Sequence, residues 1–552
     1  MKRKKWLSIL IFMLVISMAL SGCGFGSKKT ETNDNGKEKA GEEKNTDTKQ
    51  VLNVTATAEI PTMDSTKAHD AVAFTVLNNV NEGLFRQDQN NKPILAMAEN
   101  HEQSEDGLVH TFKIRDAKWS NGDPVTANDF EYAWKRVLKE AGAYNYMFVT
   151  VGVKNAQAII DGKMDVDQLG VKAVDEKTLE VTLENPNPLL ETLLTFGTFL
   201  PQNQKFVEEM GDQYALEADK LLSNGPFKLA EWKHEQSWKY VKNPEYWDAN
   251  TVKLDEINVY VVKDDATGLN LYESKKIDRV TLTAESVDNY KDDKEFKTTT
   301  QAGIGFLRFN LNHPVLGNEN IRKAVNLAID KQGLTDIALN NGAVPLYGIV
   351  PGEYYFSPDN KDFRELNGDL LKGSLDEAKK YWEKGLKETG VKEVKVAINL
   401  ADTDSSKKMA EFIQSQLETN LPGFKLEIKA VPFEQRLEIE KSIKYDISLS
   451  TWGPDYSDPM TYLDMWITGS SSNREDYSRK DYDALVEKAR LETDLSKRYE
   501  MLLQLEKMLI DEDAAIAPLY QTGQAILIHS NVKDLIEHPS GADFSYKWTY
   551  LE

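Results

Sequence analysis

Two aspartates, Asp455 and Asp458, lie three residues apart in a loop rich in aromatic residues and proline, and their carboxylates could take part in chemistry. A pair of carboxylates can act as general acid and base in a secreted hydrolase. The chain holds 89 acidic residues, however, so such pairs also arise by chance. A Gly-x-Ser-x-Gly elbow, a His-Glu-x-x-His helix and a P-loop are absent from the sequence. We therefore expect no catalytic residue, and a hydrolase stays a remote alternative.

The histidines do not favour a metal site. Zinc and similar ions are usually held by histidines or cysteines at close, regular spacing. No two histidines of this chain form such a pair, so we expect neither a metal nor a cofactor. The seven histidines are His69, His101, His110, His234, His313, His529 and His538.

The single cysteine, Cys23, comes directly after a segment with the layout of a secretory signal. Basic residues at 2–5 precede an apolar stretch at 6–20, which is short for a membrane span. Residues 20–23, Leu-Ser-Gly-Cys, resemble the lipobox of bacterial lipoproteins. The resemblance implies that Cys23 carries lipid and becomes the first residue after cleavage. The alternatives are a retained anchor helix and an unmodified, buried cysteine.

Composition limits the possible structures of the chain after Cys23. Residues 24–50 are polar and cannot bury enough apolar surface to offset the cost of ordering, which predicts a flexible linker. The 552 residues, 40% of them apolar, suffice for several lobes, and the lack of further cysteines leaves stability to a large core. A net charge of −22 repels phosphate backbones, so we expect no nucleic acid partner.

Periodicity in the rest of the chain is typical of an α/β protein. Residues 108–114 alternate apolar and polar side chains, which predicts a strand, and a turn is expected at 121–124. Thr126 with Asp129 three residues later has the spacing of a capping box before an amphipathic helix.

A second series lies late in the chain. Residues 394–400 and 424–430 read as strands with a helix over 409–417 between them, which favours a parallel pair with a right-handed crossover. A further strand at 445–450 leads into residues 452–459, Trp-Gly-Pro-Asp-Tyr-Ser-Asp-Pro, here named the 452–459 loop. Loops after the carboxyl ends of parallel strands commonly bind ligands.

Several blocks of sequence, in one order from residue 51 to the C-terminus, carry a resemblance. They are 81–85 (NEGLF), 98–107, 111–115, 118–130 (KWSNGDPVTANDF), 223–227 (SNGPF), 243–247 (NPEYW), 321–325 and 328–330. Together they resemble the bacterial extracellular solute-binding proteins that serve oligopeptide, dipeptide and nickel ABC importers. The 118–130 segment identifies this family, but we interpret it as architectural.

The resemblance implies an α/β fold of the periplasmic-binding-protein-like type II (cluster C), with two lobes that close on a solute about a hinge. It also implies three domains, of which the first is discontinuous. The expected division is 1–22 signal peptide, 23–50 lipidated cysteine and linker, 51–82, 211–305 and 521–552 domain I, 83–210 domain II, and 306–520 domain III.

The resemblance places the ligand at the 452–459 loop. In peptide-binding relatives an aspartate at the position of Asp455 pairs with the free α-amine of the peptide, and the preceding backbone pairs with the peptide main chain. Such a buried pair is favourable only when both charges are well hydrogen-bonded. The alternative is that Asp455 only closes a turn, a role that suits Asp458 better. The expected contacts of this loop are Trp452, Gly453, Asp455 and Tyr456.

A second wall of the site is expected near the N-terminus. Residues 66–71 align with a segment that lies beside the peptide in relatives, so His69, Asp70 and Ala71 would act mainly through their backbone. Tyr146 is a further expected contact, with a place in the core or rim as its alternative. Some enteric relatives carry an arginine three residues before the loop tryptophan, where this chain has Leu449. The group that meets the peptide carboxylate is thus open, with Lys441, Lys444 and Arg436 as candidates.

These features predict a lipoprotein that binds oligopeptides outside the cytoplasm and delivers them to an ABC transporter permease. Main-chain hydrogen bonds to an extended peptide would give affinity with little dependence on sequence. The alternatives within the family are a dipeptide, a peptide pheromone, a cell-wall peptide, an oligosaccharide, nickel or haem. We expect a monomer that contacts the membrane through its lipid alone, on the outer face of a cell membrane, in a Gram-positive cell.

Overall fold

The structure is a computed structural model that describes residues 49–552. The predicted signal peptide, the lipidation of Cys23 and the predicted linker up to residue 48 lie outside the described residues. Gln50, the last residue of the predicted linker, is held in place, because its backbone N–H donates to Asp255 Oδ2 over 2.8 Å. Within residues 49–552 no helix has the length and apolar character needed to cross a membrane.

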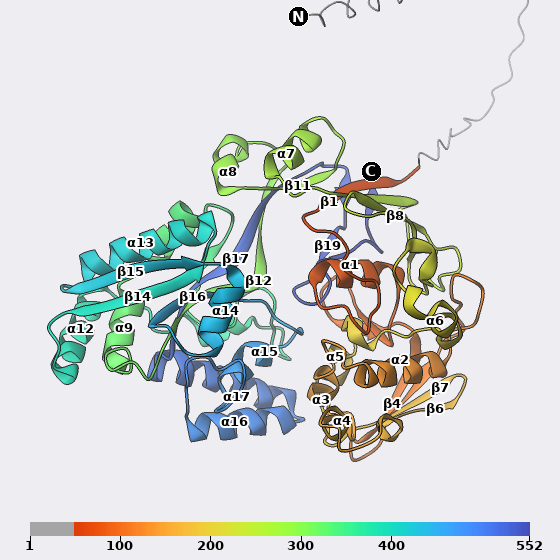
Figure 1. Ribbon diagram of the computed structural model, residues 1–552, viewed down its shortest axis with the longest axis horizontal. Helices are drawn as coiled ribbons and strands as arrows, with labels where there is room; N and C mark the ends of the chain where they lie inside the picture. Colours follow the sequence, from red (N-terminus) through yellow and green to blue (C-terminus); the bar gives the residue numbers. More distant parts are fainter. Residues whose placement is uncertain (1–48) are drawn as a thin grey trace, which may run out of the picture. The chain divides into compact units, whose positions relative to one another are not determined.

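One sheet combines the start of the described chain with a later meander. Strand β1 (Val51–Ala56) pairs in parallel with β10 (Glu256–Val261), and β9 (Ser237–Lys242) and β8 (Phe227–Lys233) continue the sheet in antiparallel order. The parallel pair joins residues about two hundred positions apart, as the colours of Figure 1 show. Leu52, Trp238 and Ile257 are among the residues of its core.

A second sheet is antiparallel and contains the first predicted strand. Its order is β4 (Ala98–Gln103), β5 (Val109–Ile114), β7 (Thr178–Thr182) and β6 (Val171–Asp175). The strand prediction for 108–114 is confirmed. Helix α2 (Ala127–Lys139) packs beside this sheet, and the capping box of Thr126 and Asp129 is present as predicted.

The largest sheet holds the 452–459 loop at the end of one strand. Its order is β11 (Arg279–Leu282), β17 (Ile516–Ile528), β12 (Phe296–Phe309), β16 (Ile447–Trp452), β14 (Val394–Ala401) and β15 (Phe424–Val431). Strands β14 and β15 are parallel and joined by α13 (Asp404–Asn420), which confirms the predicted crossover unit. Strand β16 runs two residues beyond the predicted end because β12 offers ladder partners as far as Trp452.

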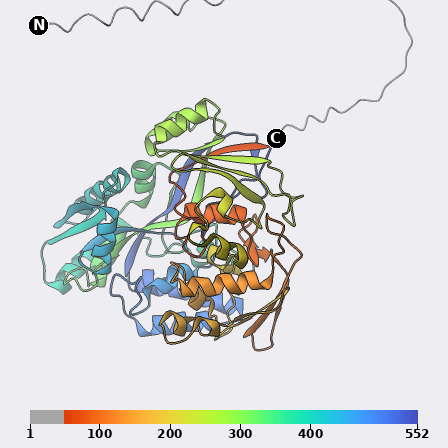
Figure 2. The same ribbon diagram turned by 45° about the vertical axis from the view of Figure 1, so that its right-hand side comes forward.

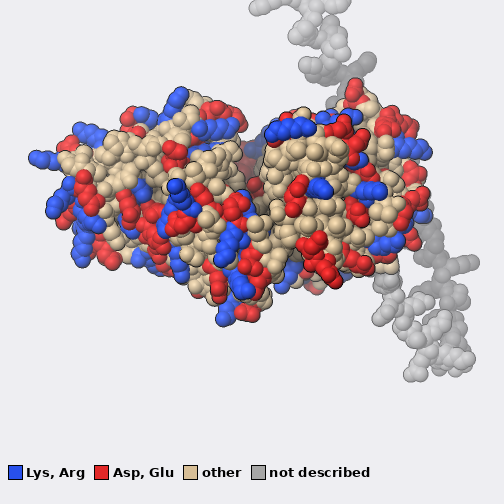
Figure 3. Space-filling view, turned by 90° about the horizontal axis from the view of Figure 1, so that it is seen from below, with Lys and Arg blue, Asp and Glu red and all other residues tan. Residues whose placement is uncertain are grey.

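Helices α9 (Glu319–Leu327) and α12 (Leu375–Thr389) pack with α13 around the outer strands of this sheet (Figures 1 and 2). Ile321, Trp382, Ile413 and Phe424 are buried together there. Strands β12 and β17 cross the expected domain boundaries at 305/306 and 520/521, and the domain division stays a prediction. Over the face drawn in Figure 3, acidic and basic side chains are interspersed.

The remaining elements connect these sheets or line the cavities described below. The helices are α1 (Ala71–Val80), α3 (Met147–Val151), α4 (Ala156–Ile160), α5 (Leu190–Leu193), α6 (Gln204–Met210), α7 (Asp265–Glu273), α8 (Ala284–Tyr290), α10 (Lys331–Gly333), α11 (Phe363–Asn367), α14 (Phe433–Lys441), α15 (Met460–Leu463), α16 (Lys480–Leu491) and α17 (Leu495–Lys507), with short turns η1 (Val166–Gln168), η2 (Gly197–Phe199), η3 (Gly211–Gln213), η4 (Ala218–Lys220), η5 (Leu334–Leu339), η6 (Asp464–Trp466) and η7 (Met508–Glu512). The short strands are β2 (Phe85–Gln87), β3 (Pro93–Leu95), β13 (Val344–Pro345), β18 (Val532–Lys533), β19 (Ile536–Glu537), β20 (Phe544–Ser545) and β21 (Tyr550–Leu551).

Candidate ligand-binding site

The 452–459 loop is anchored by Asp458. Both carboxylate oxygens of Asp458 accept hydrogen bonds from Arg498 over 2.8 Å, and Oδ1 also accepts from the Met460 backbone N–H over 2.9 Å. Both side chains are buried. A buried carboxylate with a two-pronged arginine partner holds a chain segment in one geometry. Asp458 therefore fixes the start of α15 and has no oxygen left for a ligand.

Asp455 lies in a different setting only three residues earlier. Its backbone N–H donates to Thr461 Oγ1 over 3.1 Å, which orients the residue, and the Tyr146 hydroxyl lies close to its side chain. In residues 49–552 no lysine, arginine or histidine forms an ion pair with it. Burial and, to a smaller extent, the negative charge of Asp464 raise the pKa of Asp455 to about 6, and the nearby hydroxyl of Tyr146 opposes both effects. A cation placed here would relieve the penalty.

A cavity of about 290 Å³, here named the Asp455 cavity, gathers residues from three parts of the chain, together with the single residues Tyr144 and Phe196. His69, Asp70 and Ala71 line it together with Gly453 and Asp455, so the structure brings both predicted walls to one place. The side chain of Asp70 caps α1 by accepting from the Ala73 N–H over 3.0 Å. The other oxygen, Asp70 Oδ2, is buried and has no hydrogen-bond partner among the described residues.

The third part, residues 538–543, was missed by sequence reasoning. His538, Pro539, Ser540, Gly541, Ala542 and Asp543 all line the Asp455 cavity. The Ser540 hydroxyl lies 3.3 Å from that of Ser457, which ties this segment to the loop. Its sequence, His-Pro-Ser-Gly-Ala-Asp, indicates a turn and carries no ligand-binding signal of its own.

One larger cavity shares lining residues with this one, and a second shares Tyr456 with a small cavity that Asp455 also lines. A cavity of about 420 Å³ shares Gly453, Pro454 and Asp543 with the Asp455 cavity and contains Arg279. A cavity of about 560 Å³, here named the Asp464 cavity, is lined by Tyr146 and residues 185–193 on one side and by residues of α15 to α17 on the other.

The other predicted contacts of the site divide into two groups. Tyr146 is 42% exposed and lines the Asp464 cavity, and its hydroxyl lies close to Asp455. Tyr456 is buried and lines both the Asp464 cavity and a small cavity that it shares with Asp455. Trp452, by contrast, lines none of these cavities; its ring packs against the core formed by the described residues.

None of the three candidates for the peptide carboxylate lines a described cavity. Lys441 pairs with Glu438 over 3.0 Å. Arg436 is buried and contacts Glu440 over 2.5 Å. Arg279 does line the cavity of about 420 Å³ that contains Gly453, and it pairs there with Glu537 over 2.9 Å.

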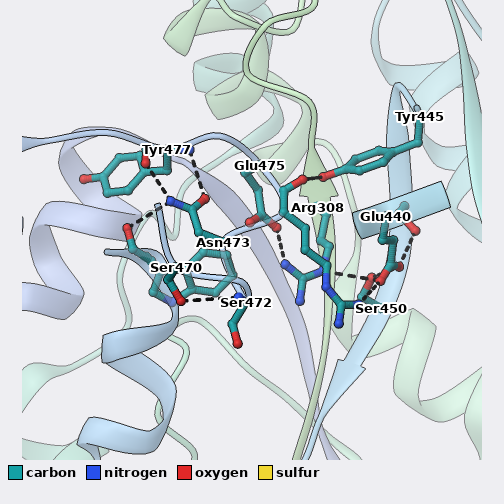
Figure 4. A network of polar contacts seen from close by, with 12 residues as sticks. Arg308, Glu440, Tyr445, Ser450, Ser470, Ser472, Asn473, Glu475 and Tyr477 are labelled. Carbon is teal, nitrogen blue, oxygen red and sulfur yellow. Dashed lines mark hydrogen bonds and ion pairs between the residues drawn. The ribbon is translucent and has the colours of Figure 1, made fainter. Parts of the chain in front are cut away.

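Glu440 belongs to a buried network behind β16, seen in Figure 4. Its Oε1 accepts hydrogen bonds from the hydroxyls of Ser448 and Ser450, each over 2.7 Å. Arg308 contacts Glu440 over 3.9 Å and Glu475 over 2.5 Å. These contacts hold the strand that carries the 452–459 loop.

Two of the histidines lie in contact with each other. His101 and His110, nine residues apart, meet across β4 and β5, with His101 Nε2 2.9 Å from His110 Nδ1. The spacing argument missed this pair because strand pairing, not sequence distance, brings the rings together. The two nitrogens face each other as hydrogen-bond partners. Within residues 49–552 no group of three or more histidine, cysteine, aspartate or glutamate side chains is arranged to hold a metal ion.

Comparison with known proteins gives a consistent result. The family model for bacterial extracellular solute-binding proteins, family 5, matches residues 92–474. The dipeptide-binding protein DppE of Bacillus subtilis is 37% identical over 99% of both chains, and the oligopeptide-binding protein OppA of the same organism is 33% identical over 98% of both.

Comparison with solved structures leads to the same result as the sequence comparison. OppA of Listeria monocytogenes bound to peptide is 44% identical, with a TM-score of 0.74 over 91% of this chain and 99% of that one. The pheromone receptor PrgZ is 37% identical, with a TM-score of 0.75 over 92% of this chain and all of that one. The predicted type II periplasmic-binding-protein-like fold is thereby confirmed. The chain belongs to the bacterial extracellular solute-binding proteins, family 5.

Proposed function

We propose that this protein binds oligopeptides outside the cytoplasm and delivers them to the permease of an ABC importer. The observation that carries the proposal is Asp455, a partly buried carboxylate that faces a cavity and has no cationic partner among residues 49–552. The α-ammonium of a peptide is the cation that would complete this site. Relatives named for binding oligopeptides and dipeptides support this choice.

The backbone beside Asp455 suits a peptide main chain. Gly453 is exposed, and a Cβ added to it would meet no atom within 4 Å, so a ligand backbone can approach closely. Hydrogen bonds to the main chain of an extended ligand give affinity without side-chain selection. The adjoining cavity of about 420 Å³ leaves room for several residues beyond the first.

Several finer statements belong to the same proposal. The ligand is released intact, so the protein is a carrier without catalytic residues. Cys23 carries lipid and holds a monomeric body to the outer face of a cell membrane in a Gram-positive cell, which the layout of residues 2–23 supports. A dipeptide or a peptide pheromone is the second candidate ligand, favoured by the similarity to DppE and PrgZ.

Calorimetry with the full chain tests the proposal. Trialanine should bind, and N-acetyl-trialanine, which lacks the ammonium, should lose most of the affinity. Mass spectrometry of the recovered peptide should show no cleavage. Equal affinity for the acetylated peptide would exclude the role of Asp455, and no binding across a peptide library would exclude the function.

Lipidation needs its own experiment. Cys23→Ala should release the protein into the medium or leave it unprocessed. Normal processing and membrane association of this variant would contradict the anchor.

A further inference from the structure

A second carboxylate lies close to the site. Asp464 begins η6 directly after α15 and lines the Asp464 cavity, with 24% of its side chain exposed. The hydroxyl of Tyr456 donates to its Oδ2 over 3.4 Å, and Arg490 Nη2 lies 3.1 Å from the same oxygen. The other oxygen, Oδ1, accepts no hydrogen bond from the described residues.

The Asp464 cavity and the Asp455 cavity are neighbours. Tyr146 lines the former, and its hydroxyl lies close to Asp455. Tyr456 lines the former and, with Asp455, the small cavity between them. Asp464 is near enough to raise the pKa of Asp455, and burial raises the pKa of Asp464 itself. Asp455 and the Asp464 cavity are therefore connected through Tyr456, which lines one cavity with Asp455 and another with Asp464.

The charges around this cavity do not balance. Arg498 is already paired with Asp458 through both of its terminal nitrogens. Arg490 is shared, because Glu487 lies 2.7 Å from its Nη1 while Asp464 holds Nη2. Arg490 is thus the one cation paired with both Asp464 and Glu487, and Asp455 is a third carboxylate close by. Asp455, Asp464 and Glu487 together exceed the charge of Arg490 by two, and Asp70 and Asp543 also line the Asp455 cavity, so one α-ammonium would not neutralise these carboxylates.

The cavity also has the shape for a long side chain. Val149, Leu189, Leu193 and Met460 supply apolar wall, and the carboxylate of Asp464 supplies a polar end. Lysine and arginine bury an apolar stem while their charged group stays with polar partners. An acidic side chain would meet Arg490, but both terminal nitrogens of Arg490 are occupied by protein carboxylates.

We propose that the Asp464 cavity is a subsite for a basic side chain, lysine or arginine, on the first residue of a peptide whose α-amine is held by Asp455. This proposal rests on the proposed function and names its preferred substrates as peptides with a doubly cationic N-terminal residue. Asp464 is the residue that determines this preference.

Three peptides that differ only at the first residue test the subsite by calorimetry. They are Lys-Ala-Ala, norleucine-Ala-Ala, which has the same carbon chain without the ammonium, and Glu-Ala-Ala. The parent should bind the lysine peptide about tenfold more tightly than the norleucine peptide, equivalent to about 1.4 kcal/mol. This ratio should fall as salt is added, since the subsite is partly open to solvent. A ratio near one, or preference for the glutamate peptide, would overturn the proposal.

Two variants act in opposite directions. Asp464→Asn should bring the ratio close to one, and Arg490→Gln should increase it, because it frees Asp464 from its protein partner. Glu500→Gln is the matched control: it removes one negative charge from an exposed position of α17 that lines no described cavity, and it should keep the parent ratio. An unchanged ratio in Asp464→Asn would overturn the proposal.

The peptide titrations distinguish a failure of the proposed function from a failure of the basic subsite. If none of the three peptides binds to the parent, the proposed function is wrong. If the norleucine peptide binds and lysine brings no advantage, the function stands and only the basic subsite is wrong. Should Asp464→Asn fold poorly, judged by its thermal unfolding, Arg490→Gln still decides, because a ratio at or below that of the parent contradicts the subsite.

Discussion

The 118–130 segment and the 452–459 loop look alike at first sight. Each comes after a strand, contains a tryptophan and a proline, and holds an aspartate whose pKa burial raises to about 6. One oxygen of Asp129 is used within the segment: Oδ2 accepts from Trp119 Nε1 over 3.1 Å and from the Thr126 N–H over 2.9 Å. Asp455 has one tyrosine hydroxyl close to it and faces a cavity.

The comparison teaches that a raised pKa does not by itself mark a binding site. Burial raises the pKa of a capping carboxylate as effectively as that of a ligand-binding one. The difference lies in the partners of the two carboxylates. Asp129 accepts hydrogen bonds from donors in its own segment, whereas Asp455 has no cationic partner among the described residues and lines a cavity. Asp458 makes the same contrast within one loop, since Arg498 satisfies it.

The largest expected effect tests whether Asp458, unlike Asp455, is a structural residue. Arg498→Met leaves the buried carboxylate of Asp458 without its cation and should lower the free energy of unfolding by about 3–5 kcal/mol. Urea unfolding monitored by circular dichroism measures this. A loss below about 1 kcal/mol would mean that Asp458 is not the anchor of the loop.

Asp455→Asn should act on binding instead. Removing one partner of a hydrogen-bonded charge pair costs about 2–5 kcal/mol, so trialanine affinity should fall by about 30-fold or more. Unfolding should occur at the same or slightly higher urea concentration, because an ionised, partly buried carboxylate without a cation is removed. Retained affinity, or a large loss of stability, would place Asp455 with Asp458 as a structural residue.

Trp119→Phe tests the 118–130 segment from the other side. It removes the indole donor to Asp129 and should lower the free energy of unfolding by about 1–3 kcal/mol. Trialanine affinity, measured by calorimetry, should stay within twofold of the parent. A tenfold loss of affinity in a folded variant would show that this segment contributes to the site after all.

The smallest effect is a pH dependence that only Asp455 should produce. Its pKa in the free protein is raised to about 6, and a bound ammonium would lower it, so affinity should be full above pH 6 and fall as Asp455 is protonated below it. The decline should approach tenfold per pH unit near pH 5, while the α-ammonium stays protonated.

The matched variants separate the two aspartates in this experiment. Asp455→Asn should flatten the affinity profile, and Trp119→Phe should leave it parallel to that of the parent. Stability behaves differently: raised pKa values at both Asp129 and Asp455 disfavour the ionised folded state, so both residues add stability as the pH falls from 6 towards 4. A flat affinity profile in the parent would contradict the ammonium partner.

Local patterns were sufficient for the elements that carry the site. The alternation at 108–114 and the capping box at Thr126 and Asp129 depend on neighbours within a few residues, and both are present. The crossover from β14 through α13 to β15 was predictable for the same reason. The position of Asp455 in the cavity wall agrees with the family resemblance, and its ligand stays a prediction.

Other features could not be predicted from the sequence because they depend on contacts between distant residues. Trp452 stays a predicted ligand contact, and the packing of its ring against the core could not be read from neighbouring residues. The 538–543 segment reaches Asp455 only through the return of the C-terminal strands, and His101 meets His110 only through pairing of β4 with β5. No local pattern encodes such approaches.

The sequence by itself determined the family, a few strands and helices around residues 108–138 and 394–450, and the loop that holds Asp455, because periodicity, caps and motifs are properties of neighbouring residues. Tertiary structure alone decided which carboxylates are satisfied. Asp458 has Arg498, Asp464 shares Arg490 with Glu487, and Asp455 has no cation among the described residues. The pairing of charges depends on distances of a few ångströms between residues far apart in the chain, and folding sets those distances.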